Sequence, residues 1–193
     1  MPSASSPVVE LLADLGQALS ALALRWYLFG AQAAILHGVA RLTADVDVTV
    51  DPGGRSGREL VAALAGGGFD LRVHDVGEFV DATRVLPFVH ARTRLPVDVV
   101  LAGPGIEELF LANAQEIVLG DVRVPVAAPE DIITMKILAG RAKDFDDVVA
   151  IVRARGPGLD LGRTREMLRL LERALARADL LPELDRALAR ARA

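Results

Sequence analysis

Two aspartates one residue apart, in a run that otherwise favours a β-strand, constrain how this chain can fold. Asp45 and Asp47 alternate with valines in the run from Ala44 to Val50. Residues two apart on a strand point to the same face, so both carboxylates share one face while the valines pack behind them. Aspartate is a poor strand former, and like charges on one face repel. A hard divalent ion such as Mg²⁺ or Mn²⁺, held by these carboxylates and by the phosphates of a substrate, would stabilise the arrangement.

The composition favours one folded domain in a reducing compartment. Of the 193 residues, 52% are hydrophobic and 25% are charged, so the chain can bury a sizeable core. Cysteine is absent, which excludes disulfides and thiolate metal sites. No segment approaches the roughly 20 unbroken apolar residues of a membrane span, and the first residues lack the pattern of a secretory signal. We therefore expect a soluble cytoplasmic protein without a membrane partner.

Hydrophobic periodicity predicts mixed strands and helices up to about residue 128 and helices alone after it. The helices expected in the first part are 7–24, 31–37, 58–64 and 106–113. The strands expected there are 26–29, 45–50, several between 69 and 100 with breaks near Gly77 and Pro87, and a hairpin at 117–124. A helix beginning at Pro129 is followed by helices at 144–153, 163–178 and 182–190.

This order of elements indicates an α/β or α+β fold, in which helices flank a mixed sheet and a C-terminal helical cap follows. We expect residues 1–154 to form the core and residues 155–193 to form a helical extension packed on it, as one compact unit. The simplest role of the extension is to cover the core. A binding face for a partner protein or for a second copy of the chain is the alternative.

A glycine stands at a strand-to-helix junction just before the acidic strand. In Phe29-Gly30-Ala31-Gln32, the glycine would let the backbone N–H groups at the start of the helix face an anion. A tight turn alone would also explain an isolated glycine. The acidic strand that follows one helix later favours the anion-binding interpretation.

A third carboxylate interrupts an apolar run. Asp98 is the single acidic residue between Leu95 and Leu101. Burying an isolated carboxylate is costly, so Asp98 needs a cation, hydrogen-bond donors or a proton. A place at a sheet edge, or bonds to local donors, would explain it without a function. Beside Asp45 and Asp47 on a neighbouring strand, it would instead complete a three-carboxylate cluster of the kind that holds two metal ions.

Basic residues in the helical part are candidates for anion contacts. Lys136 falls near the apolar stripe of its helix, so it either extends to solvent or contacts an anion, whether phosphate or carboxylate. Arg141 and Lys143 would extend a basic wall toward a triphosphate or an RNA backbone, and a solvated helix end explains Arg141 equally well. The net charge of -4 argues against broad electrostatic capture of nucleic acid, although it allows a local basic groove.

Four further polar residues flank these motifs. Arg41 and Thr43 precede the acidic strand, where they either orient the first aspartate, touch phosphate or anchor the loop. Asp144 is expected to cap the helix that follows it, and Asp147 is expected to pair with Lys143 four residues earlier.

Together these motifs resemble the minimal nucleotidyltransferase fold of the DNA polymerase β-like superfamily. The first block comprises Gly30-Ala31, a helix, Arg41-Leu42-Thr43-Ala44-Asp45-Val46-Asp47 and the later Asp98. The second block, from Pro129 to Val148, is similar to the Lys, Arg, Lys-Asp signature of the AbiEii-type branch. That branch includes toxins of type IV toxin–antitoxin pairs and many small nucleotidyltransferases. The resemblance runs from about Trp26 to Ile151.

The resemblance implies Mg²⁺-dependent transfer of a nucleoside monophosphate from an NTP to a hydroxyl, with release of pyrophosphate. By position, Asp45 and Asp47 would bind the metal, and Asp98 would share it and orient or deprotonate the acceptor. The Gly30-Ala31 corner would hold the triphosphate, where the family usually has serine or a second glycine after the first. Alanine keeps the backbone N–H but supplies no hydroxyl. The other expected nucleotide contacts are Arg41, Thr43, Lys136 and Lys143.

Two functions from different classes follow from this resemblance. The first is a nucleotidyltransferase that modifies an RNA such as tRNA, or a protein, as a monomer or weak homodimer and as the toxin partner of an antitoxin. The second is a catalytically weak or inactive relative that binds a nucleotide or a protein as an interaction module. The three carboxylates favour the enzyme, whereas Ala31 favours the module. A glycosyltransferase with a paired-aspartate motif would ordinarily need a larger nucleotide-sugar domain.

Overall fold

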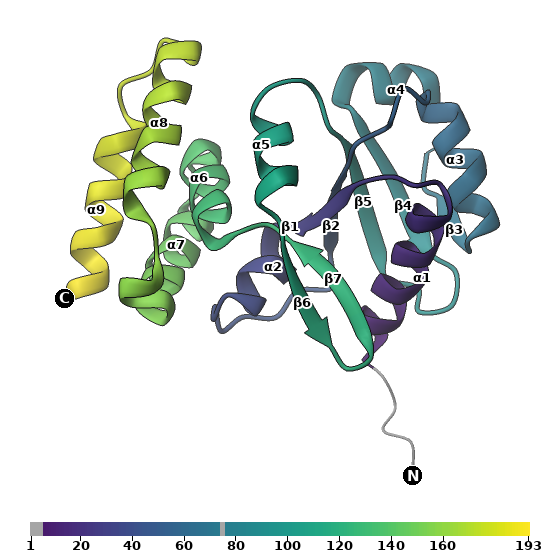
Figure 1. Cartoon of the computed structure of the whole chain (residues 1–193), viewed down its shortest axis with the longest axis horizontal. Coiled ribbons are helices and arrows are strands. Elements are labelled where there is room, and N and C mark those ends of the chain that lie inside the picture. Colours follow the sequence, from purple (N-terminus) through teal and green to yellow (C-terminus); the bar gives the residue numbers. More distant parts are fainter. Residues whose placement is uncertain (1–5, 74–75) are drawn as a thin grey trace. The chain divides into compact units, whose positions relative to one another are not determined.

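The computed structural model describes residues 6–73 and 76–193, which form two compact units (Figure 1). The sheet unit comprises Met1–Gln32 and Thr43–Ala127, and the helical unit comprises Ala33–Leu42 and Ala128–Ala193. The division falls where the helical periodicity of the sequence begins, near Pro129. The segment before the acidic strand, residues 33–42, belongs to the helical unit although it is distant from it in sequence.

The described residues of the sheet unit form a seven-stranded mixed sheet in the order β3-β4-β5-β2-β1-β7-β6. Its strands are β1 (Trp26–Phe29), β2 (Val46–Val50), β3 (Phe69–Leu71), β4 (Val85–His90), β5 (Pro96–Leu101), β6 (Gln115–Leu119) and β7 (Val122–Val126). Its helices are α1 (Pro7–Ala21), α3 (Gly57–Gly66), α4 (Val76–Thr83) and α5 (Ile106–Asn113), and α2 (Gly30–Leu36) contributes residues to both units. This mixed sheet with flanking helices confirms the predicted fold class.

Strand pairing places one residue from each of four adjacent strands in a single row. β2 is antiparallel to β1 and parallel to β5, and β5 is antiparallel to β4. The row runs from Phe29 through Asp47 and Asp98 to Pro87. Residues that pair directly in a sheet point to the same face, so the two aspartates lie side by side on one face.

The core of the sheet unit forms between the sheet and its helices. α1 buries four leucines along one side, as its helical spacing predicts, and it packs against α3 and β7. α3 begins with a capping box, in which Ser56 Oγ accepts the N–H of Glu59 at 3.3 Å and the Glu59 carboxylate accepts the N–H of Ser56 at 2.7 Å. The capping box therefore fixes where α3 begins.

The helical unit is built around one central helix, α6 (Pro129–Ala139), which packs against its neighbours α7, α8 and α9. The neighbours are α7 (Ala142–Arg155), α8 (Leu161–Leu175) and α9 (Leu180–Arg192), with a 3₁₀ turn at Gly156–Gly158. α6 is buried on nearly all sides and ends at Gly140, whose φ of 65° is left-handed. Among the described residues, no helix combines the length and the apolar character needed to cross a bilayer.

Of the two predicted breaks in strand structure between residues 69 and 100, the one near Gly77 agrees with the structure, because Gly77 lies in α4 between β3 and β4. The break near Pro87 is wrong. Pro87 lies inside β4, where its carbonyl accepts the N–H of Arg72 at 2.8 Å just after β3 has ended at Leu71. The N–H that proline lacks would point to that same side, so the pairing of β4 with β5 loses no hydrogen bond.

Replacing Phe88 with alanine should destabilise the sheet unit by about 3–5 kcal/mol, because its ring is fully buried and packs edge-on against Phe69. Urea unfolding followed by the fluorescence of Trp26, the single tryptophan, measures this loss. The control is Val118→Ala on β6, where the side chain is 62% exposed and the loss should stay below about 1 kcal/mol. Equal losses in the two variants would contradict the packing described.

Candidate functional site

The structure brings two of the three predicted carboxylates together. Asp47 pairs directly with Asp98 across the parallel β2–β5 ladder, so their Cα atoms are about one strand spacing apart, roughly 4.8 Å. Both side chains are partly exposed. The sequence reasoning required Asp98 to lie on the same face of the sheet as Asp47, and the register places it there.

Gly30 lies against the Asp47 carboxylate. It is the first residue of α2, directly after β1, and its φ of 67° is left-handed. A Cβ at this position would overlap the Asp47 carboxylate. Glycine is therefore required twice, by the backbone conformation and by the close approach of the carboxylate. Ala31 follows as the second residue of α2.

Arg72 is a site residue that sequence reasoning missed. It follows β3, its Nη2 forms an ion pair with Asp98 Oδ1, and its Nε donates to the carbonyl of Phe88 at 3.0 Å. Asp98 is 41% exposed, so water as well as Arg72 solvates its charge. The ion pair joins residues 26 positions apart in sequence, and no local sequence pattern around Arg72 indicates it.

Asp45 lies in the loop just before β2 and is exposed. Its backbone N–H donates to Thr43 Oγ1 at 3.3 Å, and the carbonyl of Thr43 accepts Nε2 of Gln32 at 3.1 Å. Thr43 thus anchors the loop that carries Asp45, one of the roles expected for it. Within residues 6–73 and 76–193, no three acidic, histidine or cysteine side chains are grouped closely enough to hold a metal ion. The predicted three-carboxylate cluster is therefore a pair, Asp47 and Asp98, with Asp45 beside it in sequence.

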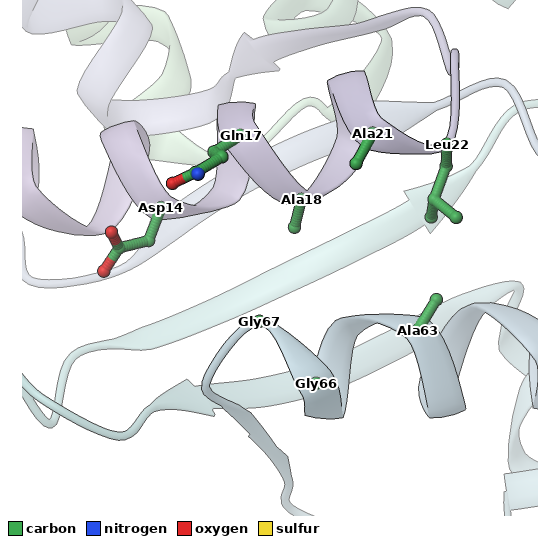
Figure 2. A pocket seen from close by; sticks show the side chains of 8 residues that line it. All are labelled: Asp14, Gln17, Ala18, Ala21, Leu22, Ala63, Gly66 and Gly67. Carbon is green, nitrogen blue, oxygen red and sulfur yellow. The ribbon is translucent and has the colours of Figure 1, made fainter.

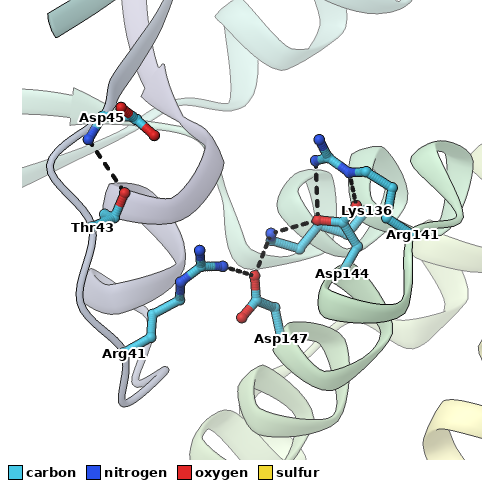
Figure 3. Close-up of polar contacts among 7 residues, drawn as sticks. All are labelled: Arg41, Thr43, Asp45, Lys136, Arg141, Asp144 and Asp147. Carbon is cyan, nitrogen blue, oxygen red and sulfur yellow. Dashed lines mark hydrogen bonds and ion pairs between the residues drawn. The ribbon is translucent and has the colours of Figure 1, made fainter.

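The basic residues expected to contact the nucleotide include two that form a charge cluster inside the helical unit (Figure 3). Lys136 Nζ donates to Asp147 Oδ2 at 2.6 Å and to Asp144 Oδ1 at 3.2 Å. Arg41 Nη1 donates to the same Asp147 oxygen at 2.8 Å, and Arg141 Nη2 donates to Asp144 Oδ1 at 3.2 Å. The left-handed Gly140 and the short link to α7 bring the end of α6 beside the start of α7, which makes these contacts.

This cluster corrects two sequence predictions. Asp147 pairs with Lys136 and Arg41 rather than with Lys143, which is exposed on the first turn of α7. Asp144 does not cap α7, because it is the third residue of that helix and its carboxylate points to Lys136 and Arg141. Both predictions are wrong for the same reason. Lys136, from the preceding helix, is a better partner for a buried carboxylate than a solvated lysine is.

Burial and ion pairing act in opposite directions on Asp144. Its burial raises the pKa, whereas hydrogen bonds from Arg141 and Lys136 and their positive charges lower it, and the pKa ends below its ordinary value of 3.8. Asp144 is therefore ionised at neutral pH, as its two cationic partners require.

A groove of about 550 Å³ lies between α1 and α3 in the sheet unit (Figure 2). Its walls are mostly alanine and glycine, with Ala18 and Ala21 of α1 facing Ala63 of α3, and Asp14 and Gln17 lie on its α1 side. None of its lining residues belongs to the carboxylate pair or the charge cluster. The groove is thus separate from the candidate site.

Comparison with protein families identifies the chain. A family model described as "Nucleotidyl transferase AbiEii toxin, Type IV TA system" matches residues 11–192. The chain belongs to the AbiEii nucleotidyltransferase family. This confirms the resemblance carried by the two motif blocks. A comparison with curated proteins found no match.

Solved nucleotidyltransferase structures share the fold of this AbiEii family member. The crystal structure of ANT(2'')-Ia in complex with adenylyl-2''-tobramycin is 16% identical, covers 89% of this chain and 99% of its own, and has a TM-score of 0.59. The solution structure of the antibiotic-resistance factor ANT(2'')-Ia is 18% identical, with coverage of 87% and 94% and a TM-score of 0.59. An antigenic nucleotidyltransferase-like protein from Paracoccidioides brasiliensis is 20% identical, with coverage of 91% of both chains and a TM-score of 0.56. Family and fold together support nucleotidyl transfer in general.

Gly30→Ala should cost more stability than Gly54→Ala. Both glycines have a left-handed φ, 67° and 82°, where an L-residue costs about 1–2 kcal/mol. A Cβ at Gly30 would also overlap the Asp47 carboxylate, whereas a Cβ at Gly54 has no atom within 4 Å. Urea unfolding followed by Trp26 fluorescence compares the two variants. Equal losses of stability in the two variants would show that the Asp47 carboxylate does not require a residue without a side chain at position 30.

Asp144→Asn should flatten the loss of stability in acid. Because the folded-state pKa of Asp144 lies below 3.8, its contribution is complete above that pH and is lost as the pH falls through the folded-state pKa. Urea midpoints followed by circular dichroism from about pH 5 to pH 2.5 measure this loss. Asp146→Asn changes an exposed carboxylate of the same helix and serves as the control. The same flattening in both variants would contradict the role of the buried ion pairs.

Proposed function

We propose that this protein transfers a nucleoside monophosphate from an NTP to a hydroxyl of an acceptor and releases pyrophosphate. The observation that carries the proposal is the Asp47–Asp98 pair on one face of the sheet, with Gly30 against Asp47. Two partly exposed carboxylates held this closely, one of them against the glycine of a strand-to-helix corner, would suit cations and phosphate. The family to which the chain belongs gives the reaction class.

The residues present fit a divalent ion. Mg²⁺ prefers oxygen ligands and is usually bound by one or two carboxylates together with substrate phosphates. Asp47 and Asp98 supply two carboxylates, the absent Cβ of Gly30 leaves room for one of them, and exposed Asp45 is two residues from Asp47. When bound, Mg²⁺ or Mn²⁺ would neutralise phosphate charge and make the acceptor hydroxyl more acidic.

The chain's own residues would contribute positioning and proton transfer. The acceptor oxygen forms a bond to the α-phosphorus while the bond from that phosphorus to the β-bridging oxygen breaks, so pyrophosphate leaves. Asp98 would accept the hydroxyl proton, and the backbone N–H groups of the Gly30-Ala31 corner would bind the triphosphate. Arg72 would have to release Asp98 for this role, because the two are paired. Arg41, Thr43, Lys136 and Lys143 stay predicted nucleotide contacts.

The acceptor is proposed from the family description. That description names a toxin of a type IV toxin–antitoxin system, so we take an RNA, tRNA in particular, as the first acceptor and a protein as the second, in a cytoplasmic protein controlled by an antitoxin. One structural neighbour was solved with adenylyl-2''-tobramycin, which adds the hydroxyl of a small molecule as a third class to test.

A second function, binding without transfer, is favoured by two observations. Ala31 supplies no hydroxyl at the position where the family usually has serine or glycine, and Arg72 occupies the Asp98 carboxylate. A protein with these features would bind a nucleotide or a protein partner and act as an interaction module. The two functions differ in whether label moves from the nucleotide to an acceptor.

The test is transfer of label from each NTP, labelled at the α-phosphate, to total tRNA, to cell protein or to an aminoglycoside in the presence of Mg²⁺. Asp47→Asn and Asp98→Asn should each lower the rate by about 10²-fold or more, because each loses one carboxylate of the pair. The control is Asp121→Asn, which changes an exposed carboxylate at the turn between β6 and β7 and should leave the rate unchanged.

Chelation of the metal should abolish transfer in the same assay. Saturable NTP binding without transfer to any of the three acceptor classes would favour the interaction module. Full transfer by both carboxylate variants would exclude the pair as the reactive site.

A further inference from the structure

Arg72 is held at two points beside the carboxylate pair. Its backbone N–H donates to the carbonyl of Pro87 at 2.8 Å, and its Nε donates to the carbonyl of Phe88 at 3.0 Å. Both acceptors belong to β4, the strand next to β5, and Pro87 pairs directly with Asp98 across the ladder. The Nη2 atom of Arg72 forms the ion pair with Asp98 Oδ1. All four residues belong to the sheet unit, so the arrangement depends on that unit alone.

This double attachment distinguishes the ion pair from an ordinary surface pair. Exposed pairs add little stability, because two flexible side chains must be ordered to form them. The bond from Nε to Phe88 fixes the guanidinium plane, so less freedom is lost when Nη2 meets Asp98. The two side chains are 40% and 41% exposed, which leaves the pair open to ions from solution. Arg72 is therefore a cation that the fold itself supplies to Asp98.

A divalent ion at the carboxylate pair would compete with this cation. The strand register sets Asp47 beside Asp98, so an ion that uses both carboxylates shares Asp98 with Arg72. Arg72 takes Oδ1, and an ion on the other oxygen would lie across a single carboxylate from the guanidinium. Two cations that close repel each other. Pairing with Arg72 and binding of a metal therefore oppose each other, and each weakens the other by the same factor.

We propose that Arg72 is an internal competitor of the divalent ion. It pairs with Asp98 until the ion replaces it, and it thereby sets the metal concentration at which the site fills. The inference rests on the proposed function for its choice of a divalent ion. The bond from Nε to Phe88 does not involve Asp98, so the released guanidinium stays attached to β4 beside the site. It then pairs with Asp98 again when the ion leaves.

Two variants separate this competition from a simple effect of charge. Arg72→Gln removes both the positive charge and the ion pair. Arg72→Lys keeps the charge, but an ammonium group lacks the planar fork that joins the Phe88 carbonyl to Asp98. Competition through the anchored ion pair predicts tighter metal binding in both variants, with the larger gain in the glutamine variant. Repulsion by charge alone predicts a gain in the glutamine variant only.

The experiment is titration of the full chain with Mn²⁺ in the absence of nucleotide, followed by the electron paramagnetic resonance signal of the free ion. We expect Arg72→Gln to tighten binding by about fivefold or more and Arg72→Lys by about threefold. The matched control is Arg123→Gln, which removes one positive charge from an exposed pair with Glu116 in the same unit and should change the affinity by less than about twofold. Asp47→Asn should weaken binding in wild-type and Arg72→Gln backgrounds, which would locate the ion at the pair.

Urea unfolding gives an independent measure of the same competition. Without divalent ion, Arg72→Gln leaves Asp98 without its cation, so its urea midpoint should lie below that of the wild type. Added Mn²⁺ should raise the midpoint more in this variant than in the wild type, because an ion that binds the folded state more tightly stabilises it more. Arg123→Gln should show the same rise as the wild type.

Several results would overturn the inference. Equal Mn²⁺ affinity in the wild type and Arg72→Gln, a lysine variant that binds as the wild type does, or no binding by any of these proteins would each do so. If Arg72→Gln does not fold by circular dichroism, the lysine variant carries the comparison. The proposed function is judged separately by label transfer. Transfer with an unchanged metal affinity in Arg72→Gln would overturn only this inference, whereas tighter binding there without any transfer would overturn only the enzymatic proposal.

Discussion

The parallel pairing of β2 with β5 is the constraint on which the candidate site depends, because it sets Asp47 and Asp98 side by side on one face of the sheet. Like charges at that spacing repel, and the fold lowers the cost in three ways. Arg72 pairs with Asp98, Gly30 leaves space for the Asp47 carboxylate, and partial exposure lets water solvate both groups. A shift of β2 by one residue would turn Asp47 to the opposite face. The burial of the valines behind the carboxylates holds this register. The valines therefore determine the position of the carboxylates as well as the packing of the core.

The helical unit handles charge differently. Asp144 and Asp147 are buried, so they need partners within the unit, and cations from α6, from the link to α7 and from residues 33–42 provide them. Such pairs add little net stability compared with apolar packing, but removing one partner is expensive. A lysine shared by two buried carboxylates would have to break those bonds before it could bind a phosphate.

Patterns local in the chain predicted most of the fold and the central pair of the site. Alternation of aspartate with valine located β2, the single charge in an apolar run located β5, and the glycine at the strand-to-helix corner located the end of β1 and the start of α2. The contacts of Arg72 and Asp147 were not predictable in this way, because each depends on strand order or helix packing that brings together residues 26 and 106 positions apart. Asp147 was assigned to Lys143 by the i,i+4 rule, which describes isolated helices and yields to a buried partner from a neighbouring helix. The predicted break at Pro87 is wrong for a related reason. The N–H that proline lacks would point to the side where β3 has already ended.

The net charge of the chain gives a misleading picture of its affinity for anions. Counted by unit, the sheet unit has eight Lys and Arg against fifteen Asp and Glu, whereas the helical unit has fourteen against eleven. The overall value of -4 is therefore the sum of a strongly acidic unit and a basic one. An acidic unit attracts divalent cations, and a basic unit attracts the phosphates that those cations accompany. Charges farther apart than about 10 Å are largely screened from one another at 0.1 M salt, so each unit acts through its own charges. The overall acidity of the chain therefore argues against nucleic-acid binding by the sheet unit alone.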